Sequence, residues 1–322
     1  KEEKVPLLPR RLFLRLAALA LAAVLALSIA LPVFASDDGD TIYINSVSDL
    51  LSLARSCAYD QWSVGKTVIL QKDLSLEGML WEPIPSFSGQ FKGNGHTISD
   101  LTITGQYSPA GLFDIVEEQG SVESLSVRGI VSVSDSADTT TGGIVGINHG
   151  TLINCQFTGV VTGDSEVGGI VGRTDGLVSG CVNQGRVLGR KDVGGIAGQA
   201  DSATIEACAN YATVTGTSRN VGGIVGRLNG KSAARSTVLR CANFGTISNG
   251  TNNFSAGIVG TAYYTTLSEC YNVGSATGNR VGGILGQTDS NTTVTSCYNA
   301  GAITLAAAGN YNYAGSLIGY NG

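Results

Sequence analysis

The chain has little histidine and little charge, and both shortages exclude functions. Its 322 residues include two histidines, His96 and His149, and neither stands in an H-E-x-x-H sequence, so the chain carries no zinc-peptidase motif. Charged residues make up 14% of the chain. Without the first 35 residues, which hold five basic and two acidic side chains, 15 basic and 23 acidic residues remain, a net charge of −8. This acidic balance, with no basic stripe, argues against nucleic acid and anionic lipid surfaces as partners.

A five-residue phrase recurs along the chain. It reads GGIVG or a close variant, and its copies start at residues 110, 142, 168, 194, 222, 256, 282 and 315, which is 26 to 34 residues apart. Self-similarity at this period indicates one structural unit stacked on itself. No unit contains the ten or more residues of helical periodicity that a βα repeat needs.

Each column of the aligned repeats keeps one chemistry. The third and fourth motif positions are apolar in every copy, and further aliphatic residues flank a cysteine column at Cys155, Cys181, Cys208, Cys241, Cys270 and Cys297. Such short apolar segments, separated by Gly, Asn, Ser and Asp, predict strands and turns. One unit then forms one coil, about 4.8 Å from the next. The predicted fold class is all-β, a parallel β-helix of three-strand coils.

Two further columns predict how the coils turn and pair. Asparagine follows most column cysteines by two residues, where identical amides on successive coils can form a ladder, at Asn183, Asn210, Asn243, Asn272 and Asn299. The motif glycines suit corners that need a positive φ or a close backbone approach. The aliphatic residue three positions before each cysteine breaks a period of two, so a bend must fall between them.

The cysteines fit a thiol stack better than disulfide bridges. Six of the seven occupy one column, where parallel Cβ atoms about 4.8 Å apart lie outside the usual disulfide range. We expect these side chains to be buried and reduced, acting as small hydrophobes. A linear stack also does not converge as zinc ligands do. Cys57 lies outside the column without an obvious partner.

The N-terminal residues resemble a targeting segment. Basic residues precede a Leu- and Ala-rich run at 16–33, and Val33 and Ala35 are suitably small for cleavage before Ser36. We expect residues 1–35 to be a signal peptide, with membrane contact only through this segment before cleavage; the alternative is a single membrane anchor. The expected location is secreted or at the cell surface. Because the chain starts with Lys1 and stops at Gly322 just after a motif start, we expect both ends to be truncated, with the repeat array cut at its C-terminus.

Residues 36–109 differ from the repeats and predict N-terminal capping coils. A strand is expected at 41–44 and a short amphipathic helix at 47–58, which would cover the open end of the core. The repeat β-helix then occupies 110–322. The later phrases DLSL (73–76), WEPI (81–84) and FSGQFKGNGHTI (87–98) lead to the first repeat.

These phrases, followed by the GGIVG…C-x-N-x-G units, resemble the bacterial GLUG-motif repeat proteins. The resemblance covers residues 41–322 and implies an exported, often surface-attached bacterial protein with β-helical repeats. Similar regions precede metallopeptidases that cleave immunoglobulin A, a peptidase signature this chain lacks. Asp114 departs from the family glycine, so the first copy fits the pattern least well.

The carboxylates form no pattern that requires catalysis. Asp175, Asp201, Asn229 and Asp289 stand three residues after successive motifs, with His149 in the same place, and the presence of Asn229 favours turn residues that bond their own backbone. We expect His96 to be a turn residue as well. We therefore expect no catalytic residue, no cofactor and no metal, and a chain that is not an enzyme.

Two features point to a binding surface for a glycan or a protein. Outward aromatic residues could dock a ligand, or stack across strands and protect the sheet. Insertions at 134–140, 216–220, 248–253 and 305–312 all precede a motif start, so we expect them to project from one corner. The candidate surface residues are Tyr271, Tyr298, Tyr263, Tyr264, Asn249 and Asn252.

Two functions remain open. The first is a non-enzymatic stalk or adhesin-like binding scaffold. The alternative is the non-catalytic N-terminal region of a larger surface hydrolase or protease, which the sequence after residue 322 would reveal.

Overall fold

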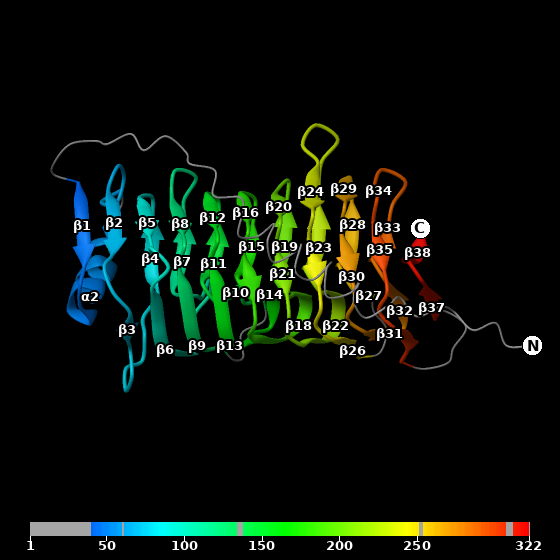
Figure 1. Cartoon of the computed structure of the whole chain (residues 1–322), viewed down its shortest axis with the longest axis horizontal. Helices are drawn as coiled ribbons and strands as arrows, with labels where there is room; N and C mark the ends of the chain where they lie inside the picture. Colours follow the sequence, from blue (N-terminus) through cyan, green and yellow to red (C-terminus); the bar gives the residue numbers. More distant parts are fainter. Residues whose placement is uncertain (1–39, 60, 134–137, 251–253, 307–311, 322) are drawn as a thin grey trace, which may run out of the picture. The chain divides into compact units, whose positions relative to one another are not determined.

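Stacked coils of β-strand make up the described chain, as the cartoon in Figure 1 shows. The structure, a computed structural model, describes residues 40–59, 61–133, 138–250, 254–306 and 312–321. Residues 40–322 form one compact unit. Every pairing between named strands is parallel, and the strands group into three sheets, here called sheets A, B and C. The predicted parallel β-helix is confirmed.

From β2 onward, each coil crosses sheets A, B and C in that order. Sheet A contains β1 (Thr41–Ile44), β2 (Thr67–Leu70), β5 (Gln90–Lys92), β8 (Ser121–Glu123), β12 (Thr151–Ile153), β16 (Leu177–Ser179), β20 (Thr204–Glu206), β24 (Ser236–Leu239), β29 (Thr265–Ser268) and β34 (Thr293–Thr295). Sheet C contains β4 (Ile84–Phe87), β7 (Phe113–Val116), β11 (Val145–Asn148), β15 (Val171–Thr174), β19 (Ala197–Asp201), β23 (Val225–Asn229), β28 (Val259–Tyr263), β33 (Leu285–Thr288) and β38 (Ile318–Asn321).

Sheet B is the longest side, because most coils cross it in two or three strands. Its strands are β3 (Leu74–Ser75), β6 (Thr97–Gly105), β9 (Ser126–Val133), β10 (Thr141–Gly142), β13 (Gln156–Thr162), β14 (Ser165–Gly168), β17 (Val182–Asn183), β18 (Arg186–Gly194), β21 (Ala209–Asn210), β22 (Val214–Gly222), β25 (Ala242–Asn243), β26 (Ile247–Asn249), β27 (Phe254–Ala256), β30 (Tyr271–Asn272), β31 (Ala276–Gly278), β32 (Arg280–Gly282), β35 (Tyr298–Asn299), β36 (Ile303–Leu305) and β37 (Tyr313–Gly315).

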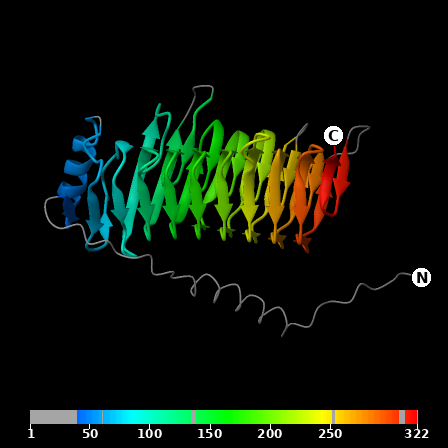
Figure 2. The same ribbon diagram turned by 90° about the horizontal axis from the view of Figure 1, so that it is seen from above.

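The helix α2 (Val47–Ser56) packs against β1 at one end of the stack, where Figure 2 shows it beside the first coil. Ser46 caps its N-terminus, since its Oγ accepts a hydrogen bond from Asp49 N at 3.2 Å. Leu50 and Leu53 face the core and are buried. The helix therefore covers the apolar interior of the first coil, as the sequence predicted.

The motif columns point into the core. Third- and fourth-position side chains are fully buried from Leu112 and Phe113 through Ile284 and Leu285. In the last described coil Leu317 is 42% exposed, because no described coil lies over it. Each inner coil therefore buries its apolar motif side chains against the coils on both sides, and this burial stabilises the stack.

A residue with positive φ turns each coil from sheet A into sheet B. It directly precedes the column cysteine, and the clearest examples are Asn154, Ala207, Arg240, Glu269 and Ser296, with φ between 52° and 55°. This left-handed residue is the bend that the three-residue spacing required. The cysteines that follow are unpaired, and all are buried except the partly exposed Cys297.

The asparagine ladder holds successive coils together inside sheet B. Asn210 Nδ2 donates to Asn243 Oδ1 at 2.8 Å, and Asn243 Nδ2 donates to Asn272 Oδ1 at 2.8 Å. These amides are fully buried. A Cβ on the second glycine of the motif, such as Gly223, would clash with the amide of Asn243. The motif glycines are therefore needed for close approach, and none of them has a positive φ.

Candidate functional site

The corner between sheets B and C carries the chemistry that varies most along the stack. Its residues stand two positions before each motif and are called the corner column: Ser108, Thr140, Glu166, Asp192, Asn220, Phe254, Arg280 and Tyr313. In the last coils they pair directly, with Phe254 beside Arg280 and Arg280 beside Tyr313. The column therefore changes along the rod from hydroxyl and acid to aromatic and cationic side chains.

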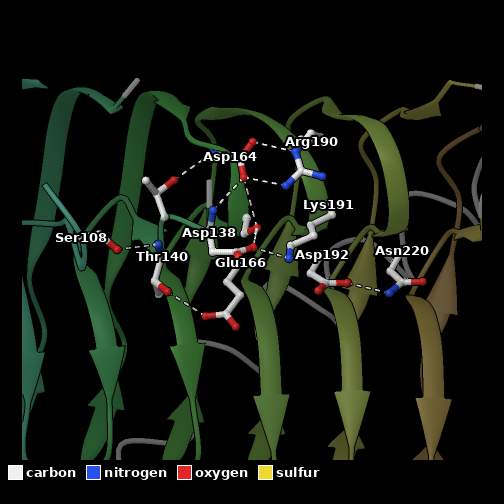
Figure 3. Close-up of polar contacts among 11 residues, drawn as sticks. Ser108, Asp138, Thr140, Asp164, Glu166, Arg190, Lys191, Asp192 and Asn220 are labelled. Atoms are coloured by element: carbon white, nitrogen blue, oxygen red, sulfur yellow. Dashed lines mark hydrogen bonds and ion pairs between the residues drawn. The ribbon is translucent and has the colours of Figure 1, made fainter. Parts of the chain in front are cut away.

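Hydrogen bonds join the polar half of the column, as drawn in Figure 3. Thr140 N donates to Ser108 Oγ at 3.2 Å, and Thr140 Oγ1 donates to Glu166 Oε2 at 2.7 Å. Further along, Asn220 Nδ2 donates to Asp192 Oδ1 at 2.6 Å. These side chains therefore already have partners within the corner.

Ion pairs neutralise the charges beside this half of the column (Figure 3). Arg190 grips Asp164 through Nε and Nη2, at 2.7 and 2.8 Å, while Lys191 pairs with Asp138. The Arg190 guanidinium lowers the pKa of Asp164 to about 2. Burial instead raises the pKa of Asp192, and the Asn220 amide opposes that rise. These acids therefore bond to neighbouring side chains of the corner.

An open groove of about 370 Å³ begins where the polar half ends. Three successive coils build it, with Arg227 of β23 in register with Thr261 of β28, and Thr261 in register with Gln287 of β33. Its lining residues are Arg219, Asn220, Arg227, Phe254, Thr261, Tyr263, Arg280 and Gln287. We call this feature the corner groove.

The electrostatics of the corner groove differ from those of the preceding coils. Among the described residues, neither Arg219 nor Arg227 forms an ion pair with a carboxylate, whereas Arg173 does so with Asp201 at 3.1 Å. Arg280 lies over the Phe254 ring, 5.0 Å from its centre. Three guanidinium groups thus gather on a rod that is acidic as a whole. Sequence inspection missed them because Arg219 and Arg227 lie on either side of one motif and Arg280 lies two coils further on.

Thr261 lines the corner groove with a hydroxyl that has no hydrogen-bond partner among the described residues. The residue is 2% exposed. A buried, unsatisfied hydroxyl is costly, so it usually marks a place where a ligand or water completes the bonding.

The predicted aromatic residues Tyr271 and Tyr298 lie on sheet B, outside the corner groove. They are register partners on β30 and β35, and Tyr298 is 57% exposed. Tyr271 contacts Phe244 edge-on, with ring centres 5.7 Å apart, and Phe244 stacks on Tyr211 at 4.6 Å. Sequence inspection missed Tyr211 and Phe244, although both stand three residues after a column cysteine.

The other predicted surface residues have separate positions. Tyr263 lies in the corner groove, and its hydroxyl donates to Gln287 Oε1 at 3.1 Å. Tyr264 has a φ of 54° at the turn from sheet C to sheet A. Asn249 is 4% exposed and donates to Phe254 O, so its prediction as a surface contact is wrong. Asn252 lies outside the described residues. The five described candidates therefore do not form one site.

The insertions also behave differently from one another. Residues 216–220 belong to β22, which takes up its extra residue as a bulge opposite β18. The expectation that they project as a loop is therefore wrong for this unit. The other three insertions fall partly outside the described residues.

The acid column that follows the motifs bonds mainly between coils. His149 Nδ1 is 2.8 Å from Asp175 Oδ1, and Asn229 Nδ2 donates to Asp201 Oδ1 at 2.9 Å. Only Asp289 of this set accepts from a nearby backbone group, Asn291 N, within the described residues. The prediction of turn residues bonding their own backbone holds for Asp289 alone. No group of three or more His, Cys, Asp or Glu in the described ranges is arranged to hold a metal ion.

The described part of the chain contains no helix long and apolar enough to span a membrane. The expected leader at 1–35 lies outside that part.

Comparisons with known proteins support the fold more than any activity. No family model matches the chain. Halomucin from Haloquadratum walsbyi (strain DSM 16790 / HBSQ001) is 34% identical over 84 residues, which are 26% of this chain and 1% of Halomucin. A "putative immunoglobulin A1 protease" from Bacteroides ovatus has a similar structure, with a TM-score of 0.59 and 16% identity over 82% of this chain and 83% of that chain. At this identity the likeness establishes a shared β-helical repeat fold alone.

Proposed function

We propose that this chain is a non-catalytic, exported repeat module of the GLUG kind, which binds a surface glycan or protein. The observation that carries the proposal is the corner groove on an acidic rod. There Arg219 and Arg227, without a carboxylate partner among the described residues, meet aromatic rings and the Thr261 hydroxyl, which has no hydrogen-bond partner in the same ranges. The leader-like residues 1–35 support export. The fold shared with the Bacteroides ovatus protein and the Halomucin match support a secreted or cell-surface location.

The carboxylates of the corner and of sheet C do not suit polysaccharide hydrolysis. Glycoside hydrolysis needs two carboxylates that flank one bond. Asp164 is held by Arg190, Asp192 by Asn220, and Asp201 by Asn229 and Arg173, so each already serves the stack.

Two measurements test this function. A bacterial host expressing the chain with its leader should release it into the medium or expose it at the cell surface, where external protease removes it. The purified chain, incubated with a panel of polysaccharides, should generate no new reducing ends. Retention in the cytoplasm, or turnover abolished by Asp201→Asn, contradicts the proposal.

A second candidate is the non-catalytic front region of a larger surface hydrolase or protease. It is favoured by the fold shared with the Bacteroides ovatus protein, since that likeness extends over most of both chains. Sequencing the gene beyond codon 322 decides between them: a catalytic domain supports this second candidate, and further coils or a sorting signal support a free-standing module.

A further inference from the structure

We propose that the corner groove binds an acidic saccharide, with its arginines on the carboxylate or sulfate groups and its neutral side chains on the sugar hydroxyls. This inference names the ligand class of the binding module proposed above and rests on that function.

The charge of the groove selects an anion. In the described coils before it, three cations have carboxylate partners: Arg173 pairs with Asp201, Arg190 with Asp164, and Lys191 with Asp138. Arg219 and Arg227 have none among the described residues. A guanidinium group binds a planar oxyanion through paired hydrogen bonds. An anionic ligand would therefore give these two arginines the acceptor that the aspartates give the cations of the preceding coils.

The groove is built before a ligand arrives. Arg227 Nε donates to Asn229 Oδ1 at 3.3 Å, and Arg280 stacks on the rings of Phe254 and Tyr320. These contacts limit the rotamers of both arginines, so binding loses less side-chain entropy. Nearby, Asp192 is 5% exposed and its carboxylate accepts the Asn220 amide, while Arg227 and Arg219 act on that carboxylate only at longer range and oppose the rise in its pKa that burial causes.

The neutral side chains favour a hydroxyl-rich ligand. Thr261 belongs to the lining of the groove, between Arg227 on the preceding coil and Gln287 on the next, and its buried hydroxyl has no hydrogen-bond partner among the described residues. Successive coils lie about 4.8 Å apart, so these three side chains form a line along the rod axis. A linear saccharide lying along this line meets a guanidinium, a hydroxyl and an amide in turn, while its ring faces can pack on Phe254 and Tyr263.

An acidic peptide suits the groove less well. Peptides often bind by adding a strand to an open sheet edge. Here β23, β28 and β33 pair with one another, as do β27 and β32, so their backbone groups are already used in the ladders. Recognition must come from side chains alone.

Calorimetric titration of the whole chain tests the proposal. Trigalacturonate should bind, and its affinity should fall as salt is raised, because the contact is ionic. Galactotriose, which lacks the carboxylates, should bind at least about tenfold more weakly, as expected when charge-assisted hydrogen bonds are lost. Equal affinity for the two sugars, or no binding of either, overturns the inference. Tighter binding of an oligoglutamate peptide overturns the saccharide assignment.

Three variants locate the binding. Arg219→Gln and Arg227→Gln should each weaken trigalacturonate binding about tenfold, whereas Arg240→Gln, the same change at a different corner, should not. Thr261→Val keeps the side-chain shape, so it should weaken binding while leaving the melting temperature equal or higher. Unchanged binding in both groove arginine variants refutes the site. Export and the absence of turnover are measured separately from saccharide binding. A failure of these binding tests is therefore distinguishable from a failure of the proposed module function.

Discussion

Removing one amide from the asparagine ladder should destabilise the whole stack. In Asn243, Oδ1 accepts from Asn210 Nδ2 at 2.8 Å and from Gly245 N at 3.2 Å, while Nδ2 donates to Asn272 Oδ1 at 2.8 Å and to Gly245 O at 2.9 Å. All of this is buried. Asn243→Ala therefore removes four hydrogen bonds and leaves partners that water cannot reach.

The expected cost follows from those orphaned groups. Each buried donor or acceptor that loses its partner costs about 1–3 kcal/mol, so two such groups put the loss near 4 kcal/mol. That is a large part of the 5–15 kcal/mol that typically stabilises a domain. Chemical denaturation followed by circular dichroism measures it. The control is Asn45→Ala, since the Asn45 side chain is exposed. A difference below about 1 kcal/mol between the two variants refutes the ladder's structural role.

Three other predictions concern the core, the thiols and one buried acid. Ile224→Asp buries an unpaired charge and should lower the melting temperature far more than the exposed Thr246→Ala; equal values would reject the inward assignment. Burial raises the pKa of Cys57 to about 11 and also raises that of Cys208, so thiol titration should find few reactive groups in the native chain and seven in denaturant; disulfides in the column would contradict this. Burial raises the pKa of Asp114 to about 7, above its unfolded value, so this carboxyl destabilises the fold increasingly as pH rises from about 4 to 7. Asp114→Asn should therefore raise the free energy of unfolding by up to about 4 kcal/mol at pH 8 and change it little at pH 4. The same gain at both pH values excludes ionisation as the cause.

The fold could be predicted because its columns repeat. Each position that stacks on its own copy must keep one chemistry, so Ile224 and Asn243 reveal their burial through their equivalents in other units. The bend before each cysteine followed from spacing alone. The role of the glycines could be predicted only in part. Gly223 lies against the Asn243 amide, where a Cβ would clash, and the sequence alone does not show that this amide lies there.

The corner groove could not be predicted in the same way. Arg227, Thr261 and Gln287 each directly follow a motif and so share a column, but Arg219 and Arg280 come from two other columns, and their spacing along the chain does not indicate that they meet this line. The corner between sheets B and C brings the three columns together. The burial of Asn249 was missed for a related reason, because an insertion-rich segment looks exposed in the sequence whereas β26 holds this residue inside sheet B.

Incubation of the chain with trigalacturonate, followed by mass spectrometry of both partners, shows whether the corner groove binds an acidic saccharide and leaves it intact. The native chain should form a complex that releases the saccharide at high salt with its length unchanged, and Arg227→Gln should bind the saccharide about tenfold more weakly. Recovery of shortened saccharide contradicts the view that the module binds without catalysis, and recovery of equal complex with Arg227→Gln contradicts the placement of binding at the corner groove.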